Sequence, residues 1–187
     1  IFDEILLKRS AELGVLVEEE SSVGKIMIDD SNRGAVVINK NGQQYFQPAK
    51  FIVDASGQSA LLARNLNLRQ WDENFQNLAV YGYFTGAKKL PIPDENNIFI
   101  ESFENGWVWT IPLNGDITSV GAVVDSNKSA AELRKVDSRT FLEDQLSLTN
   151  RTCDMLSQAK LQSDAKILKD WSYTTSKMAG DGWVLAG

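Results

Sequence analysis

The chain has 187 residues, 43% apolar and 24% charged, which is ordinary for a globular protein and long enough for one substantial domain. A net charge of −6 with scattered lysines and arginines argues against binding to nucleic acid or to an anionic membrane surface. The absence of histidine excludes serine–histidine and cysteine–histidine hydrolases built from these residues, and the single cysteine excludes an internal disulfide.

No apolar run approaches the roughly 20 residues that a membrane-spanning helix needs, and the first residues do not form a signal-peptide pattern. We therefore expect no membrane span and a cytoplasmic location. The acidic pairs lie in polar, turn-like stretches without partner ligands, so we expect no metal site.

The predicted elements form a mixed α/β chain. Residues 2–13 have a helical pattern that stops at Gly14, and residues 15–29 predict a strand, a break and a second strand. Asn41 and Gly42 predict a tight hairpin between two short strands. An apolar strand then ends in small residues, and the helix after it has Ser59 as its expected N-cap.

Hairpins dominate the middle of the chain. Alternating patterns predict strands in four stretches: 75–86, 96–104, 106–113 and 116–125. A helical stretch is expected from about Ser129 to Gln158, with a break near Thr149, and two strand-like segments follow it. Because the sequence starts inside a helical pattern and stops in a strand-like run, we expect a fragment of a longer polypeptide.

The stretch "GWVWTIPL" places two tryptophans two residues apart. In a strand, Trp107, Trp109 and Ile111 share one face, and Val108 and Thr110 share the other. Two interpretations follow from this pattern. The indoles form part of a β-sheet core, or they form an aromatic wall beside a ligand site.

Asn114 and Gly115 follow this strand and favour a two-residue turn that folds residues 116–124 back antiparallel. A two-residue turn sets the register of the two strands and therefore the cross-strand partners. The expected pairs are Trp109 with Val120, Trp107 with Ala122, and Ile111 with Thr118.

Four stretches resemble a known family. "WVWTIP" fits the W-x-W-x-I-P motif of flavin-dependent, tryptophan-type halogenases, a branch of the FAD-dependent aromatic monooxygenase group. "FIVDASGQSALLAR" is similar to a flavin-contacting segment of that group, and "DWSYTTSKMAGDGWVLAG" is similar to the strands that lead into its Gly-Asp segment. The opening "FDEILLKRSAELGVLV" looks like a helix and strand of the same enzymes.

The resemblance implies a fragment of an FAD-dependent monooxygenase-type fold, with an antiparallel-rich substrate-domain sheet, helices and edges of the FAD-binding domain. It assigns residues 1–70 to a partial FAD-binding domain and residues 71–170 to the substrate-binding sheet and helices. Residues 171–187 return to the FAD-binding domain.

The resemblance also assigns site residues, each with a structural alternative. The active-site wall consists of Trp107, Trp109, Ile111 and Pro112. The cofactor-binding residues are Asp54, Ala55, Ser56, Gly57, Val23 and Gly187. From the residues alone, the Asp-Ala-Ser-Gly stretch is explained by a strand-to-helix turn, Val23 by a place in the core and Gly187 by a turn. The reactive lysine of the family belongs upstream, so no catalytic residue is assigned here.

The leading hypothesis is the middle of an FAD-dependent halogenase that acts on an aromatic or pyrrole-type ring, with reduced FAD, O2 and halide as the implied reactants. The fragment alone is expected to be inactive. The implied partners are a flavin reductase and a small aromatic substrate, either free or tethered to a carrier protein. Two alternatives stay open: a related monooxygenase or geranylgeranyl-reductase-like oxidoreductase, and an acidic α/β binding module without redox chemistry.

Overall fold

The computed structural model describes residues 2–28, 34–72, 75–169 and 172–186. The chain divides into two compact units, which are described separately. The first contains residues 1–70 and 175–187, and the second contains residues 71–174. Within the described ranges, no helix is long and apolar enough to cross a membrane.

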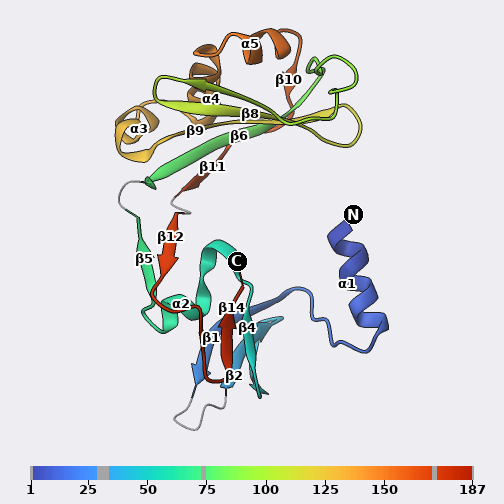
Figure 1. The fold of residues 1–187 in the computed structure, drawn as a ribbon, viewed down its shortest axis with the longest axis vertical. Helices are drawn as coiled ribbons and strands as arrows, with labels where there is room; N and C mark the ends of the chain where they lie inside the picture. Colours follow the sequence, from blue (N-terminus) through green and yellow to red (C-terminus); the bar gives the residue numbers. More distant parts are fainter. Residues whose placement is uncertain (1, 29–33, 73–74, 170–171, 187) are drawn as a thin grey trace. The chain divides into compact units, whose positions relative to one another are not determined.

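The first unit is formed by both ends of the sequence (Figure 1). Its elements are α1 (Phe2–Glu12), β1 (Ser21–Ile28), β2 (Gly34–Lys40), β3 (Gln43–Ala49), β4 (Ile52–Asp54), the 3-10 turn η1 (Gly57–Ser59), α2 (Leu61–Asn65), β13 (Ala179–Gly180) and β14 (Trp183–Leu185).

Local sequence explains most of these elements. Helix α1 has Asp3 and Glu4 in its first turn, where the helix dipole favours acids, and it stops before Gly14 at φ +94°. Asn41 and Gly42 both adopt positive φ, as the predicted tight hairpin between β2 and β3 requires. The strand expected directly after Gly14 is wrong, because residues 15–18 form no strand.

Two small sheets build the core of this unit. Strands β1, β2 and β3 form an antiparallel sheet, and β13, β14 and β4 form a second one in which β14 and β4 run parallel. Ile26, Ile52, Leu62 and Trp183 pack together as the buried cluster. The core of the first unit therefore joins β1 of one sheet and β4 and β14 of the other to α2.

The second unit is a sheet covered by helices on one side (Figure 1). Its elements are β6 (Asn77–Thr85), β7 (Phe99–Phe103), β8 (Gly106–Pro112), β9 (Ile117–Asp125), α3 (Ser126–Leu133), α4 (Ser138–Ser147), α5 (Arg151–Met155), β10 (Lys160–Leu161) and β11 (Lys166–Lys169). Strand β5 (Arg69–Trp71) pairs with β12 (Tyr173–Thr175) where the chain passes between the units.

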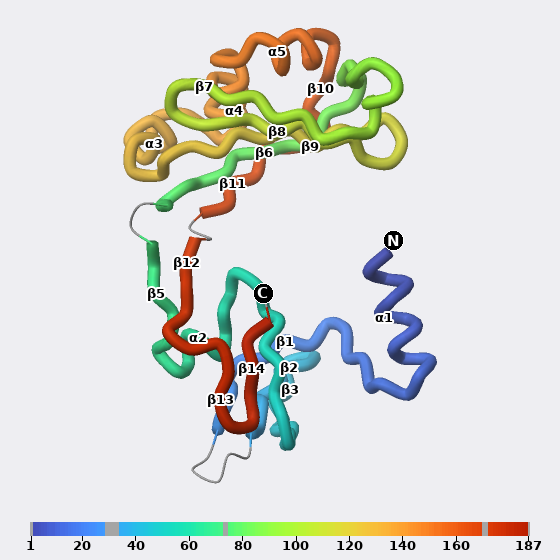
Figure 2. Tube along the Cα trace, viewed as in Figure 1, coloured from blue at the N-terminus to red at the C-terminus, as the bar shows by residue number. Residues whose placement is uncertain are grey.

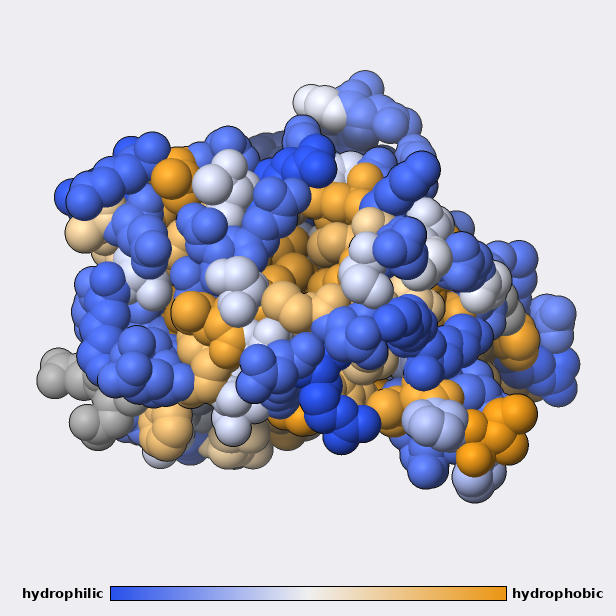
Figure 3. All heavy atoms as spheres, turned by 90° about the horizontal axis from the view of Figure 1, so that it is seen from above, coloured by the Kyte–Doolittle hydropathy of each residue, from blue (hydrophilic) through white to orange (hydrophobic). Residues whose placement is uncertain are grey.

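The main sheet has the strand order β10-β6-β9-β8-β7, and β11 also pairs with β6. Alternate residues of these strands face α4 and form a fully buried core, for example Val80, Val108 and Val120 against Phe141 and Leu142. This face of the sheet is therefore the structural core of the unit, and we call it the helix face. Seen from above, hydrophilic residues surround a hydrophobic patch near the centre of the surface (Figure 3).

The helical stretch contains one more break than predicted. The expected break near Thr149 separates α4 from α5, but a second break separates α3 from α4. Asp125 and Asp137 explain both starts, since each carboxylate accepts hydrogen bonds from two backbone N–H groups of the helix that follows it. Capping therefore starts the first helix at Ser126, three residues earlier than the apolar pattern predicts.

The turn between β8 and β9 also differs from the prediction. Pro112 pairs with Thr118, and the Leu113 N–H donates to the Ile117 carbonyl, which leaves a three-residue loop containing Gly115 at φ +72°. Gly115 is the middle residue of this loop, and its left-handed conformation is one that glycine adopts without steric cost. The register therefore shifts by one residue, and the predicted cross-strand pairs are wrong.

Candidate functional site

Asp54 organises the loop that follows β4. One of its carboxylate oxygens accepts the Ser56 N–H at 2.9 Å, and the other accepts the Leu62 N–H at 2.7 Å. The side chain is almost fully buried, whereas Ala55, Ser56 and Gly57 are exposed. Asp54 thus holds the loop in shape, and the three small residues after it are the ones that a ligand could approach.

The start of α2 is capped by residues from this loop. The Leu61 N–H donates to the Ser56 hydroxyl at 2.9 Å, and Asp54 takes the next N–H along the chain. The expectation that Ser59 is the N-cap is wrong, since its hydroxyl instead donates to the Ser56 carbonyl. These two N–H groups are already bonded within the loop, so they do not offer a phosphate site.

Two segments that the sequence connects with flavin lie side by side. The tube of β14 runs beside the segment that contains β4 (Figure 2). The two strands are parallel, with Leu185 opposite Asp54, and the Ala186 N–H donates to the Asp54 carbonyl at 2.8 Å. The carboxyl ends of adjacent parallel strands are a common place for cofactors to bind. Gly187 follows directly but lies outside the described residues, as do Asp170 and Trp171 of the same similar stretch.

Val23 lines a surface pocket of about 250 Å³ together with Leu16, Glu18 and Ile38. It is 41% exposed, so it is not the core residue that the structural alternative described. Opposite Ile38, Tyr45 donates a hydrogen bond to Glu18. That hydrogen bond, with smaller contributions from burial and the carboxylate charge, raises the pKa of the Tyr45 hydroxyl.

In the second unit, the indoles lie on the face of the sheet opposite the helix face. We call this the aromatic face, and it contains Tyr81, Tyr83, Trp107 and Trp109. The ring centroids of Trp107 and Trp109 are 6.0 Å apart, and those of Trp109 and Tyr81 are 5.9 Å apart. The four rings therefore form one continuous apolar surface across β8, β9 and β6.

Gly121 lets the Trp109 indole lie across the sheet. It is the cross-strand partner of both Trp109 and Tyr81. A Cβ at this position would lie 2.4 Å from Cζ2 of Trp109 and 2.5 Å from Cβ of Tyr81. The indole Nε1 also donates to the Ser119 hydroxyl at 3.2 Å. Sheet geometry and one hydrogen bond together fix the orientation of Trp109.

The tryptophans do not belong to the core of this unit. Among the described residues, the buried cluster contains Val108 from β8 but neither indole. Trp107 is 39% exposed, whereas Val108 between the two indoles is fully buried. Ile111 and Pro112 are half-buried at the end of the same strand. The first of the two interpretations, a core cluster, is therefore wrong for this unit.

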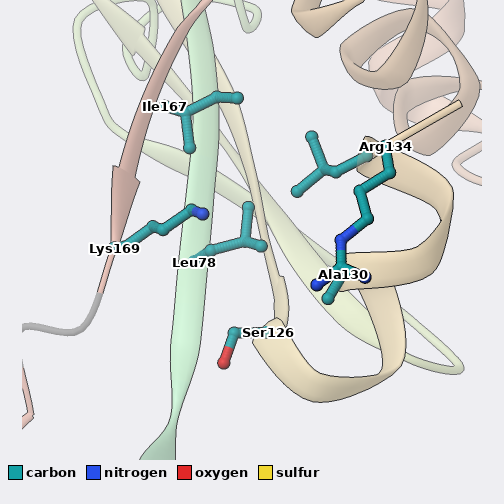
Figure 4. A pocket seen from close by; sticks show the side chains of 7 residues that line it. Leu78, Ser126, Ala130, Arg134, Ile167 and Lys169 are labelled. Atoms are coloured by element: carbon teal, nitrogen blue, oxygen red, sulfur yellow. The ribbon is translucent and has the colours of Figure 1, made fainter. Parts of the chain in front are cut away.

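A separate pocket of about 290 Å³ opens on the helix face, between α3 and the ends of β6 and β11 (Figure 4). Leu78, Ala130 and Ile167 form its apolar part, and Arg134 and Lys169 are its charged residues. Within the described ranges, no group of three or more His, Cys, Asp or Glu side chains is placed to hold a metal ion. This pocket and the aromatic face lie on opposite sides of one sheet.

Comparison with known proteins identifies the family. The family model described as tryptophan halogenase matches residues 1–156. The chain belongs to the tryptophan halogenase family. This confirms the resemblance that "WVWTIP" carries, and the motif forms part of β8 on the aromatic face.

Individual halogenases match the whole chain. It is 31% identical to the flavin-dependent halogenase armH3 of Armillaria mellea and to the 1H-pyrrole-2-carbonyl-[peptidyl-carrier protein] chlorinase of Pseudomonas fluorescens. Each comparison covers 100% of this chain, but only 41% and 42% of those relatives. This halogenase-family chain thus spans about two fifths of the length of the curated relatives it matches.

Solved structures confirm the fold class. The crystal structure of CmlS, a flavin-dependent halogenase, is 33% identical, with a TM-score of 0.91 over 100% of this chain and 34% of that one. The myxobacterial chondrochloren halogenase CndH is also 33% identical, with a TM-score of 0.89 over 100% of this chain and 44% of that one. The mixed α/β arrangement is therefore that of part of a flavin-dependent halogenase.

Sequence reasoning missed two members of the aromatic face. Tyr81 and Tyr83 repeat the spacing of the two tryptophans on β6, within the stretch "LAVYGYFT". That repeated spacing was the available signal. The contact of Trp109 with Gly121 could not be found in the same way, because it depends on the register of β8 and β9.

Proposed function

We propose that this chain forms the middle part of an FAD-dependent halogenase that halogenates an electron-rich aromatic or pyrrole-type ring. The observation that carries the proposal is the exposed aromatic face, on which the two indoles of the halogenase motif lie apart from the buried core. Reduced FAD, O2 and halide would supply the oxidised halogen. The reactive lysine is proposed to lie outside these residues.

The loop after β4 is the proposed flavin-contacting segment. Its exposed Ala55, Ser56 and Gly57 carry little side-chain bulk, and a Cβ built on Gly57 meets no atom within 4 Å. These residues thus fit a flat cofactor that approaches the backbone closely. In this proposal Asp54 positions the loop, Val23 packs on the cofactor, and Gly187 begins the Gly-Asp segment.

The aromatic face is the proposed wall of the substrate chamber. Trp107, Trp109, Ile111 and Pro112 present rigid apolar surface with few rotatable bonds. Such a surface excludes water and holds an aromatic ring in a limited set of orientations. We propose that this chain contributes substrate orientation and water exclusion to the reaction.

The proposed partners are a small aromatic substrate and a flavin reductase that supplies reduced FAD in the cytoplasm. One relative has a carrier-protein-tethered pyrrole in its name, which supports tethered as well as free substrates as candidates. A related FAD-dependent monooxygenase or a geranylgeranyl-reductase-like enzyme, which would turn over without halide, is the alternative within this fold.

The test is turnover of the complete enzyme with reduced FAD, with and without chloride or bromide, on a panel of phenols, indoles and pyrroles. The expected product gains the mass and isotope pattern of the halogen. Oxygenated or reduced product in the absence of halide would support the alternative. A complete protein without flavin absorbance would contradict both and favour the binding module.

The role of the wall is tested by Trp109→Ala. We expect turnover to fall by about a hundredfold because the ring loses its orientation, while the free energy of unfolding falls by less than the roughly 3 kcal/mol lost at a buried tryptophan. Trp71→Ala is the matched control, since Trp71 is 45% exposed and packs edge-on against Tyr173. Equal turnover in both variants would contradict the wall.

A further inference from the structure

The aromatic face ends in lysines at the edge formed by β10 and β11. Lys166 pairs with Tyr81, and Lys160 pairs with Thr85, so both project from the same face as the aromatic rings. The Lys166 ammonium lies 5.5 Å from the centroid of the Tyr83 ring. This cation–π contact holds a positive charge over one end of the aromatic face.

Neither lysine is engaged in an ion pair among the residues that the structure describes. Among the described residues, no carboxylate forms an ion pair with Lys160 or Lys166, whereas Lys88 pairs with Asp154 at 2.7 Å. The strand residues of the aromatic face include no Asp or Glu between Ile117 and Val123 or between Ala79 and Thr85. In a chain of net charge −6, this edge is therefore locally cationic.

Acids close to this face are engaged elsewhere. Asp125, at the end of β9, accepts hydrogen bonds from the first N–H groups of α3. Asp116, in the loop before β9, accepts the Gly86 N–H at 2.9 Å. Since neither of these carboxylates forms an ion pair with Lys160 or Lys166 in the described structure, both ammonium groups are open to an anion from outside.

We propose that Lys166, assisted by Lys160, binds an anionic group of the substrate while the aromatic ring lies on Trp109, Tyr81 and Tyr83. This rests on the proposed function and adds a charge to the substrate class. Strand β11 is two strands away from Gly121, a separation of about 10 Å. The lysine stem and a short substituent on the ring together span that distance.

The anion has two chemical sources that share this recognition. It is the carboxylate of a free aromatic acid, or the phosphate ester of the arm that joins a tethered ring to its carrier. Pyrrole-2-carboxylate and its neutral carboxamide probe the first source. Pyrrole-2-carbonyl-4′-phosphopantetheine and the pantetheine thioester without phosphate probe the second.

The experiment measures KM for both probe pairs in the complete enzyme. For one pair, Lys166→Gln should raise the ratio of the anionic KM to the neutral KM by about fivefold, as expected for one partly exposed ion pair. Lys166→Arg should restore most of the ratio because it keeps the charge. Lys169→Gln is the control, since Lys169 lies on the same strand but faces the pocket on the opposite side (Figure 4).

The pair whose ratio changes identifies the source of the anion. The proposal is overturned if Lys166→Gln and Lys169→Gln give the same KM ratios for both probe pairs. It is also overturned if Lys166→Arg raises the KM ratio as much as Lys166→Gln does. If the unaltered enzyme makes no halogenated product from any probe or from the aromatic panel, the proposed function fails instead. The two failures are therefore distinguishable.

Discussion

The two faces of the main sheet are built from alternate residues of the same strands, yet they have opposite properties. On the helix face, Val80, Val108 and Val120 are fully buried against α4. On the aromatic face, the larger side chains of Trp107 and Trp109 stay partly exposed. Hydrophobic burial alone would favour covering the larger rings first.

This difference separates folding from function along one strand. Residues on the helix face pack against the helices, and truncating their side chains should lower the free energy of unfolding. Truncating the partly exposed rings of the aromatic face should cost less stability, whereas adding bulk beneath them should not be tolerated. Single substitutions on the two faces test this difference.

Gly121→Ala is expected to have the largest effect on stability. The added methyl would lie 2.5 Å from Cβ of Tyr81, which cannot move without the strand, and 2.6 Å from Cη2 of Trp109. We expect a loss of about 3 kcal/mol in the free energy of unfolding, measured by urea denaturation.

The control is Gly82→Ala on the helix face. There the added methyl would meet only Cδ1 of Leu161 at close range, the end of a flexible side chain that can rotate away. We expect a loss below about 1 kcal/mol. Equal losses at the two glycines would show that the contact with Trp109 and Tyr81 is not specially close.

Val108→Ala and Trp107→Ala compare neighbouring residues of β8. Val108 is 0% exposed, and its truncation leaves a cavity in the core that should cost about 2 kcal/mol. Trp107→Ala removes more atoms but should cost less, because its ring is already 39% exposed. A larger loss of stability for Trp107→Ala would reverse the assignment of the two faces.

Much of this arrangement could be predicted from the sequence. The period of two in "WVWTIP" separates Trp107 from Val108 correctly, and Asn41 with Gly42 forms the expected hairpin. The family resemblance is confirmed by residues 1–156. These features depend on neighbouring residues, which local patterns record directly.

Features that depend on distant contacts could not be predicted. Asn114 and Gly115 are compatible with a two- or a three-residue loop, and the choice makes Gly121 rather than Val120 the partner of Trp109. Likewise, the Asp54 carboxylate accepts the N–H of Leu62, eight residues later in the chain, and the Ser59 hydroxyl does not cap the helix. The assignment of the site residues to FAD and substrate stays a prediction.

Glu101→Gln tests how α5 is attached to the helix face of the sheet. One oxygen of Glu101 accepts the N–H groups of Asn150 and Arg151, and the other accepts the N–H and hydroxyl of Thr152. Partial burial acts to raise the pKa of Glu101, but these hydrogen bonds outweigh it and the pKa lies below its ordinary value. The charged carboxylate therefore docks the start of α5 on β7.

Because the folded-state pKa is lowered, this stabilisation is present above the ordinary carboxyl pKa and is lost as the pH falls through the lower folded value. We expect Glu101→Gln to cost about 1 kcal/mol at pH 7, with the difference from wild type shrinking in acid. Thermal unfolding across this pH range measures it, with the exposed Glu104→Gln as control. A difference independent of pH would contradict a role for the charge.

Ser119→Ala is expected to have the smallest effect on stability, and it bears on the aromatic face alone. Its hydroxyl accepts the Trp109 Nε1–H at 3.2 Å, and one partly exposed hydrogen bond contributes about 0.5 kcal/mol. Ser102→Ala is the control, since Ser102 pairs with Trp107 on the same face but is exposed.

If Gly121 and Ser119 act together to orient the indole, Ser119→Ala should lower kcat of the complete enzyme although nearly all of the protein stays folded. Ser102→Ala should change neither kcat nor stability. Equal kcat values in the two variants would mean that the close fit over Gly121 suffices to hold Trp109. The hydrogen bond would then satisfy a polar group, and the shape of the sheet alone would position the ring.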